Sequence, residues 1–310
     1  MFSTFRACIV RTALLVAAVL ALHPFEAAAA DVRAPLAKSG QLDLHQWNFE
    51  RDGPVFLAGE WSFFWQKFID PASPSTGAMQ FSELPDAWVG TLVDGTKLNS
   101  SGYASYQLEV NCGNASNLSM ALPVQHSSAR VYVNGREVAN QGRPGMDDER
   151  SNPAVTQQYV PLVDAVCPFN IVVHIANFEH RRGGMVRGIQ LGTSVQMQTR
   201  REAGLIRDMG AFGGLALLSV LPILFFIWRR KEMAPLYFGL FGLSCCVFIA
   251  LSGQRAALPV LGSLGWDWFL SLKFLSFYGG LTMFARFVHA AYPREFGRWQ
   301  INTAGVLGAA

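Results

Sequence analysis

Apolar and polar residues alternate with a period of two along several short segments in the first two thirds of the chain. Segments 106–110 and 118–122 each place apolar side chains on one face of an extended strand. The clearest pattern is at 129–133, which Asn134 and Gly135 follow directly. An Asn-Gly pair supplies the two positive-φ residues of a type I′ hairpin turn. The pattern therefore predicts short antiparallel strands joined by tight turns.

Short strands with turn signals and no long helical period predict a jelly-roll β-sandwich over residues 31–205. This length suffices for one hydrophobic core. The stretch "GEWSFFW" places Trp61, Phe63 and Trp65 on one strand face. Such an aromatic row either packs in the core or forms a platform for sugar rings. In a small sandwich, packing in the core is the favoured interpretation.

Long apolar segments follow the predicted sandwich. Residues 209–228 carry no charge, and twenty helical residues rise about 30 Å, one hydrocarbon thickness. Further spans are predicted at 235–252 and 266–289, and an incomplete one at 299–310. Residues 206–310 thus form the start of a transmembrane helical bundle. The predicted fold class is a multi-domain membrane protein, an all-β sandwich followed by a truncated α-helical bundle.

The N-terminal residues 1–30 have the pattern of a secretory signal peptide. Arg6 and Arg11 precede the short apolar run 13–22, and small residues at 27–30 offer a cleavage site. The alternative is an uncleaved anchor helix. In both cases the sandwich is exported to an oxidising compartment.

The basic residues indicate the orientation in the membrane. Arg229, Arg230 and Lys231 follow the first span, and basic loops face the cytoplasm. Residues 31–208 are therefore expected to be periplasmic or extracellular, and the protein to be a multi-pass protein of the inner (plasma) membrane. The lipid bilayer is an expected partner.

Composition agrees with a membrane protein and disfavours nucleic-acid binding. The 310 residues are 51% hydrophobic and only 15% charged, whereas soluble domains carry about 25% charged residues. The formal net charge is +3 and no long basic run occurs, so no nucleic-acid partner is predicted.

The cysteines suggest one disulfide. Of five cysteines, Cys8 lies in the signal segment, and Cys245 and Cys246 lie in an apolar span. Cys112 and Cys167 remain in the exported part, where a pair of cysteines favours a disulfide. The alternative is two unpaired buried thiols.

A strand-like run at 170–176 ends in the polar stretch His180, Arg181 and Arg182, followed by two glycines. On a continuing strand the two arginines would point to opposite faces, one of them toward the core. Glycine permits a bend or bulge. The segment is therefore predicted to leave the sheet at a loop.

Two roles stay open for this loop. Arg181 could form a structural ion pair with Glu179 or with the acidic residues 147–149. Alternatively His180, Arg181 and Arg182 could bind a sugar hydroxyl or carboxylate. The outward-facing residues Arg130 and Tyr132 are further candidates for the same ligand site.

Catalytic and metal-binding patterns are weak. No G-x-S-x-G or H-E-x-x-H motif occurs, and "MDDER" lacks the spacing of a calcium loop. Neither catalytic residues nor a metal or cofactor are predicted, and residues 1–310 are not expected to form an enzyme. Lys273 lies inside the third predicted span, where an unpaired charge is costly, so it is a functional candidate. The alternative is a side chain that extends to the membrane surface.

Several stretches together resemble the bacterial seven-transmembrane receptors with diverse intracellular signalling modules. They are "LAGEWSFFW", "LPDAW", "GYASYQLEV", "ARVYVNGREVANQG", "IANFEHRRGGM" with "IQLG", and "RRKEMAPLYFGLFGL". The match covers about residue 57 onward, and "GYASY" departs mildly from the family's usual "GYGTY". The exported part also resembles galactose-binding-like jelly rolls.

The resemblance implies an outer jelly-roll sensor, a seven-helix bundle and a cytoplasmic output module such as a diguanylate cyclase or histidine kinase. Because the fourth span stops early, we expect the sequence to be a fragment that lacks this module. The predicted function is transmembrane signalling in response to a small, carbohydrate-like ligand, with a homodimer as an open possibility. The alternatives are a membrane-tethered carbohydrate-binding protein without signalling output and an exported glycosidase.

Overall fold

The computed structural model describes residues 34–73, 80–113, 115–125, 127–154, 157–163, 165–252 and 266–297. The predicted signal peptide at 1–30 and the fourth span at 299–310 lie outside the described residues.

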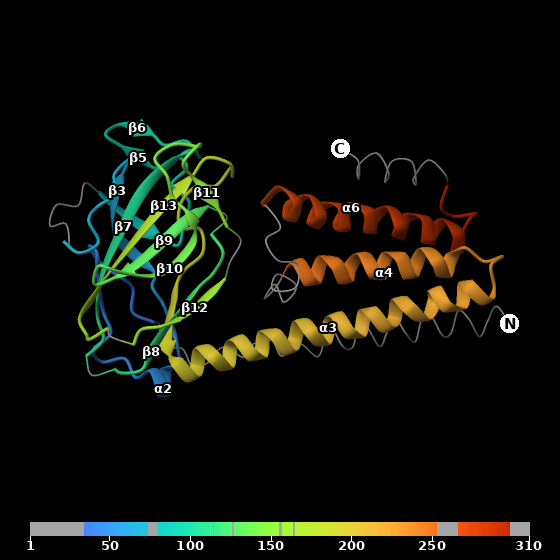
Figure 1. Ribbon diagram of the computed structural model, residues 1–310, viewed down its shortest axis with the longest axis horizontal. Coiled ribbons are helices and arrows are strands. Elements are labelled where there is room, and N and C mark those ends of the chain that lie inside the picture. Colours follow the sequence, from blue (N-terminus) through green and yellow to red (C-terminus); the bar gives the residue numbers. More distant parts are fainter. Residues whose placement is uncertain are drawn as a thin grey trace. The chain divides into compact units, whose positions relative to one another are not determined.

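The first part of the chain forms two facing β-sheets and a small hairpin (Figure 1). The larger sheet has the order β11-β10-β9-β13-β7-β3-β4, with β1 pairing in parallel with β7. Its strands are β1 (Gln41–Asp43), β3 (Gly59–Trp65), β4 (Gln80–Leu84), β7 (Gly102–Asn111), β9 (Ser128–Val133), β10 (Arg136–Arg143), β11 (Asn152–Pro153) and β13 (Phe169–Asn177).

The smaller sheet has the order β12-β8-β14-β2, and the hairpin pairs β5 with β6. These strands are β2 (Val55–Phe56), β5 (Leu92–Val93), β6 (Thr96–Lys97), β8 (Leu118–Leu122), β12 (Gln158–Pro161) and β14 (Gln190–Thr193). A short helix, α2 (Phe49–Asp52), precedes β2.

One hydrophobic core lies between the two sheets. Trp61 and Phe63 of β3 are fully buried in it, and Trp65 packs against its edge. The core interpretation of the aromatic row is therefore confirmed. Buried apolar side chains alternate with more exposed ones along residues 106–110 of β7 and along β9, as the period-two pattern predicts, whereas β13 is buried on both faces.

The β9–β10 connection is the predicted tight turn. Val133 pairs with Arg136, so the turn has two residues, Asn134 with φ 49° and Gly135 with φ 83°. Positive φ at both positions is what a type I′ turn requires. The hairpin predicted from these residues is confirmed.

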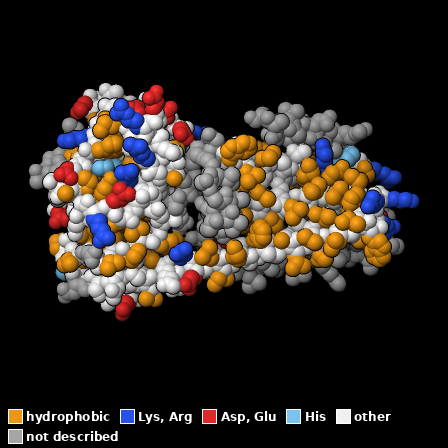
Figure 2. Space-filling view, viewed as in Figure 1, with side chains coloured by type: hydrophobic (Ala, Val, Ile, Leu, Met, Phe, Trp, Pro, Cys, Tyr) orange, Lys and Arg blue, Asp and Glu red, His pale blue; other side chains and the backbone are white. Residues whose placement is uncertain are grey.

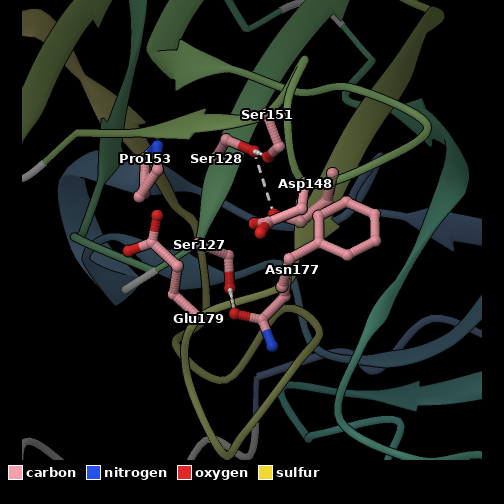
Figure 3. A pocket seen from close by; sticks show the side chains of 9 residues that line it. Ser127, Ser128, Asp148, Ser151, Pro153, Asn177 and Glu179 are labelled. Atoms are coloured by element: carbon pink, nitrogen blue, oxygen red, sulfur yellow. Dashed lines mark hydrogen bonds between the residues drawn. The ribbon is translucent and has the colours of Figure 1, made fainter.

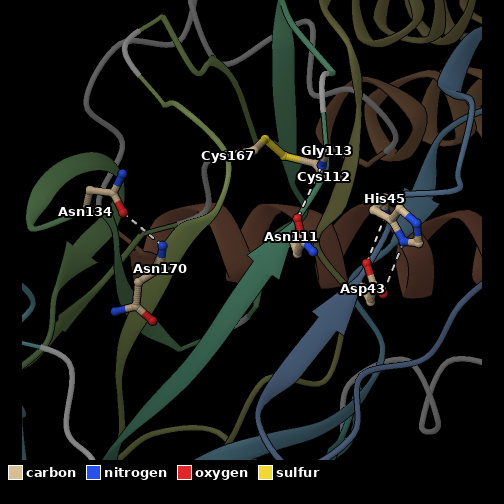
Figure 4. The surroundings of a disulfide bond; sticks show 8 residues. All are labelled: Asp43, His45, Asn111, Cys112, Gly113, Asn134, Cys167 and Asn170. Carbon is tan, nitrogen blue, oxygen red and sulfur yellow. Dashed lines mark hydrogen bonds and ion pairs between the residues drawn. A yellow bond between two sulfur atoms is a disulfide. The ribbon is translucent and has the colours of Figure 1, made fainter.

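A disulfide joins Cys112, which follows β7, to Cys167, which precedes β13 (Figure 4). The two Cα atoms are 5.6 Å apart. Since β7 and β13 are antiparallel neighbours, the bond closes one end of this strand pair. Cys245 and Cys246 are free thiols.

The last strand of the smaller sheet continues directly into a long helix. β14 ends at Thr193, and α3 (Ser194–Trp228) begins at the next residue, before the predicted boundary at 205/206. The cause is a capping box: the Gln196 N–H donates to Thr193 Oγ1 (3.3 Å), and Thr193 N–H donates to the Gln196 side chain (3.0 Å).

In the described part of the chain, two helices are long and apolar enough to cross a membrane: α3, which has 35 residues, and α4 (Ala234–Leu251). A third helix, α6 (Trp266–Ala291), packs on α4 through the ring pairs Phe238–Phe287 and Phe241–Phe284. Hydrophobic side chains gather over all three helices, whereas acidic and basic side chains are spread over the β-sheets (Figure 2).

Lys273 of α6 lies at the contact between α4 and α6. Its ammonium group is 5.6 Å from the centre of the Phe248 ring of α4, within the range of a cation–π interaction. The predicted intramembrane charge therefore has an aromatic partner on the neighbouring helix.

Candidate ligand-binding site

A shallow hollow of about 200 Å³ opens where β9 begins and β13 ends (Figure 3). Most of this volume is open to solvent, and the enclosed space of about 10 Å³ has room for about one water molecule, far less than the roughly 300–1,000 Å³ of typical ligand pockets. Three separate segments line it: Ser127, Ser128, Asp148, Ser151, Pro153, Ala176, Asn177, Phe178 and Glu179.

The pairing of β9 with β13 builds the floor of the hollow. Ser128 lies opposite Ala176, and its hydroxyl donates to the Ala176 carbonyl oxygen (2.9 Å). Ser151, from the connection between β10 and β11, places its hydroxyl 2.8 Å from that of Ser128. The connection itself is held by Asp147, whose carboxylate accepts from the Arg150 N–H (2.9 Å).

Asn177, the last residue of β13, fixes the loop that follows. Its amide nitrogen donates to the carbonyl oxygens of Ser100 (2.8 Å) and His180 (2.6 Å). Its amide oxygen accepts from the Ser127 hydroxyl (3.4 Å) and the His180 N–H (3.2 Å). The side chain is buried, so these bonds hold the rim in one conformation.

The glycines after the arginines allow close packing on Trp88. A Cβ on Gly183 would lie 2.4 Å from the Ser100 carbonyl oxygen and 2.4 Å from the Trp88 ring, and Gly184 has a φ of 112°. The backbone N–H of Trp88 donates to the Gly183 carbonyl oxygen (2.9 Å). β13 already ends at Asn177, so the segment leaves the sheet at a loop, as predicted, and the glycines let this loop pack closely on the Trp88 ring.

The structure divides the five predicted ligand residues between two places, and none of them lines the hollow. His180, Arg181 and Arg182 belong to the loop just after the hollow, where Arg181 and Arg182 are exposed. Neither arginine forms an ion pair with a residue in the described part of the chain. Among the described residues, Arg181 therefore does not pair with Glu179 or with the acidic residues 147–149, which were proposed as its structural partners.

Arg130 and Tyr132 lie elsewhere, on the outer face of the larger sheet. The Arg130 guanidinium is 3.6 Å from the Glu137 carboxylate. The Tyr132 ring lies 5.0 Å from that of His174, which in turn stacks on Phe68 at 4.8 Å.

Residues 66–73, here called the strap, cross this outer face. Ile69 of the strap packs on Phe64 and Val172 in a small second core. Its N–H donates to the Ser105 hydroxyl (3.1 Å), and its carbonyl oxygen accepts from His174 Nε2 (2.9 Å). Since a carbonyl oxygen cannot donate, His174 must carry its proton on Nε2 here.

Burial lowers the pKa of His174 below its ordinary value of 6.5, and the neighbouring positive charge of Arg130 acts in the same direction. The hydrogen bond to Ile69 opposes both effects. Glu137 is the acidic group that faces Arg130. The neutral ring is therefore the form that the folded strap accommodates.

We expect the stability of the sandwich to decrease as the pH falls below about 6.5. In that range the unfolded chain protonates His174 while the folded protein resists it; above about 6.5 the ring is neutral in both states and contributes no pH dependence. The urea midpoint at which the sandwich becomes protease-sensitive should fall between pH 7.5 and 5. The urea midpoint of His174→Gln should fall less. Equal decreases in wild type and His174→Gln would contradict this expectation.

The described residues contain no group of three or more His, Cys, Asp or Glu placed to hold an ion. The sequence did not single out the hollow. Its only local signals were the acidic residues 147–149 and Glu179, which we considered as partners for Arg181.

Comparison with known proteins yields no family. No protein-family model and no curated protein matches the chain. Among solved structures, a β-glucuronidase from Faecalibacterium prausnitzii is similar, with 15% sequence identity and a TM-score of 0.35. The matched region covers 44% of this chain and 31% of the β-glucuronidase chain. A glycosyl hydrolase family 2 member from Bacteroides cellulosilyticus DSM 14838 is 18% identical with a TM-score of 0.34, and covers 45% and 20%.

The chain thus spans less than a third of the length of these solved structures. At such identities and TM-scores, the likeness carries no argument about the ligand or activity of this chain.

Proposed function

We propose that this chain is the sensor and first membrane helices of a transmembrane receptor, related to the bacterial seven-transmembrane receptors with diverse intracellular signalling modules. In this proposal a jelly-roll sandwich outside the cell binds a small carbohydrate-like ligand. Further helices and a cytoplasmic output module complete the receptor.

The observation that carries the proposal is the direct junction of β14 and α3. β14 lies inside the smaller sheet, between β8 and β2, and no linker separates Thr193 from Ser194. A passive tether needs only a flexible connection, which would absorb any movement of the sheet. A helix fixed to a central strand instead moves with that strand, so ligand binding could shift a two-state equilibrium that α3 shares.

Two further features support an exported sandwich on a multi-pass anchor in the plasma membrane. Disulfides such as Cys112–Cys167 persist in oxidising compartments. The turn between the apolar helices α3 and α4 carries Arg229, Arg230 and Lys231, as a cytoplasmic loop would.

The carboxylates of the hollow do not favour catalysis. A glycosidase needs a pair of carboxyl groups, one of which keeps its proton in a sheltered environment. Asp148 and Glu179 share the hollow, but both are exposed to solvent. We therefore propose a binding site without hydrolytic activity.

Site-directed labelling of intact cells tests the topology. In a background with Cys245 and Cys246 changed to alanine, Ala34→Cys should react with a membrane-impermeant maleimide. Lys231→Cys should react only after the membrane is permeabilised, because its loop is cytoplasmic. Labelling of position 231 but not of position 34 in intact cells would overturn the proposed function.

A further inference from the structure

The strap lies on the outer face of the larger sheet without being a strand of either sheet. It begins at Gln66, whose φ of 50° turns the chain away from the end of β3, and the Gln66 N–H donates to the Tyr103 carbonyl oxygen (2.9 Å). Its next hydrogen bonds to the sheet are made by side chains. Ser105 of β7 accepts from the Ile69 N–H and donates to the Lys67 carbonyl oxygen (2.8 Å), and His174 of β13 donates to Ile69. The strap can therefore open without breaking a strand pair.

The packing of the strap is also separate from the rest of the sandwich. Ile69 packs in the small second core with Phe64 and Val172, and Tyr132 lies against its edge, whereas the main core lies between the two sheets. A segment with few apolar contacts of its own can open locally. β13, by contrast, is paired along both sides, with β7 and β9. Opening of the strap would uncover the second core and leave the main core intact.

Of the two side chains that hold Ile69, His174 is the one that titrates between pH 5 and 8. Its Nε2 proton is used in the hydrogen bond to Ile69, and the residue is only 9% exposed. A second proton would be carried by Nδ1, which has no hydrogen-bond partner among the described residues. A buried charge with an unused donor is costly, whereas water would solvate both in the open form.

The charged side chains around the ring also disfavour a second proton. Arg130 of β9 repels a protonated His174, and Glu137 of β10, which would attract it, is paired with Arg130 at 3.6 Å. On the strap itself, Lys67 and Asp70 are exposed, and the Asp70 carboxylate accepts a backbone N–H of its own turn. The closed strap thus supplies no acidic partner for the imidazolium among the described residues.

Aromatic rings cover the imidazole. Phe68 of the strap stacks on it at 4.8 Å, Tyr132 lies at 5.0 Å, and Tyr103 lies 5.0 Å from the Phe68 ring. An aromatic face attracts a cation, which opposes the repulsion from Arg130. Burial has the largest effect on His174, however, and lowers its pKa.

We infer that the strap is a pH-sensitive closure, which stays on the outer face while His174 is neutral and opens when His174 is protonated, with both sheets intact. Opening uncovers Phe64, Val172 and Tyr132, so acid would expose an apolar strip on the outer face. The inference goes beyond the proposed function, because it requires neither a sugar nor a signal through the membrane.

Amide hydrogen exchange of the full chain, purified in detergent, measures the opening. The quantity to follow is the protection factor of the Ile69 amide, since it removes the direct effect of pH on the intrinsic exchange rate. It should be constant above about pH 6.5, where His174 is neutral in both forms. Between pH 7.5 and 5 it should fall at least about threefold and at most about 30-fold, the limit for an open form with an ordinary histidine pKa of about 6.5. The amides of β7 and β13 should keep their protection.

Two variants separate the titration from the mere loss of a contact. His174→Gln keeps an amide nitrogen that can donate to the Ile69 carbonyl oxygen but does not titrate, so the protection of Ile69 should be the same at pH 7.5 and 5. Ser105→Ala is the matched control, because it removes the other side chain that holds Ile69. It should lower the protection at every pH and keep the wild-type ratio between pH 7.5 and 5.

Arg130→Gln provides a third variant, which leaves the contacts of Ile69 in place. Without the repelling charge, the closed strap should accept the proton more readily, so the ratio between pH 7.5 and 5 should be smaller than in the wild type. An unchanged protection factor in the wild type, or the same fall in His174→Gln, would refute the inference. An equal fall for β7 and β13 would also refute it, because acid would then unfold the whole sandwich. None of these outcomes bears on the proposed function.

Discussion

Replacing Cys112 and Cys167 together by alanine should lower the free energy of unfolding of the sandwich by about 4 kcal/mol, because the bond closes a loop with a sequence separation of 55 residues. In the chain-entropy model, the cross-link restricts the unfolded chain more than the folded one. For a domain of this size, such a loss corresponds to a decrease of about 8–16 °C in the melting temperature. Thermal unfolding of the purified chain, followed by protease sensitivity of the sandwich, measures it.

A reducing agent and a second pair of cysteines provide the controls. Dithiothreitol should lower the melting temperature of the wild type to that of the double alanine variant, and should leave the variant unchanged. Replacing Cys245 and Cys246, which are free thiols in α4, should not alter the response. If the double variant melted at the wild-type temperature, the disulfide would not stabilise the sandwich.

The features that the sequence predicted depend on local patterns. The turn at Asn134 and Gly135 requires positive φ at two adjacent residues, and this chemistry is visible in the residue types themselves. The apolar runs that became α3 and α4 are visible because length and composition suffice to recognise them. The start of α3 was also local, since Thr193 and Gln196 form a capping box, but the polar residues that follow obscured it.

The candidate site could not be predicted in the same way, because its residues come from distant segments. Ser128 and Ala176 become neighbours only through the pairing of β9 with β13, and Ser151 reaches them across a further connection. No local pattern encodes this arrangement. The loop at His180 attracted attention because its charges are conspicuous, whereas the hollow is lined mainly by small polar side chains.

The strap explains why β13 is buried on both faces, which the sequence pattern did not predict. β13 is buried along almost its whole length, so its outward-facing residues Val172 and His174 do not alternate with exposed polar ones. Residues 66–73 cover that face, and Phe68 and Ile69 pack on it. A histidine in such a strand looks like an exposed polar residue in the sequence. Its burial follows only from a loop more than 100 residues earlier in the chain.

Weakening the anchor of α3 should produce the second large effect. Met197 is buried, and its methyl group occupies the space beside Gly192, where an added Cβ would lie 2.9 Å away. The Gln196 side chain also donates to the Phe49 carbonyl oxygen. The double variant Gln196→Ala/Met197→Ala should lose about 2–3 kcal/mol of local stability. Amide hydrogen exchange in the first two turns of α3 should then accelerate about 30-fold to 150-fold.

Val195 provides the matched control, since it is the adjacent residue but lies on the exposed side of the helix. Val195→Ala should leave the exchange rates within about twofold of the wild type, because surface substitutions change stability little. Equal acceleration in the control and the double variant would show that the contacts of Gln196 and Met197 do not anchor the helix.

The same variants decide whether the β14–α3 junction transmits a signal. Gln196 and Met197 belong to this junction, so Gln196→Ala/Met197→Ala should bind any sugar that the wild type binds with unchanged affinity. In the wild type and Val195→Ala, that sugar should change hydrogen exchange in α3 beyond Met209, because the helix moves with the sheet. In the double variant this response should disappear, since a frayed first turn no longer couples the sheet to α3. A response that persisted without the anchor would mean that the signal reaches the membrane helices by another route.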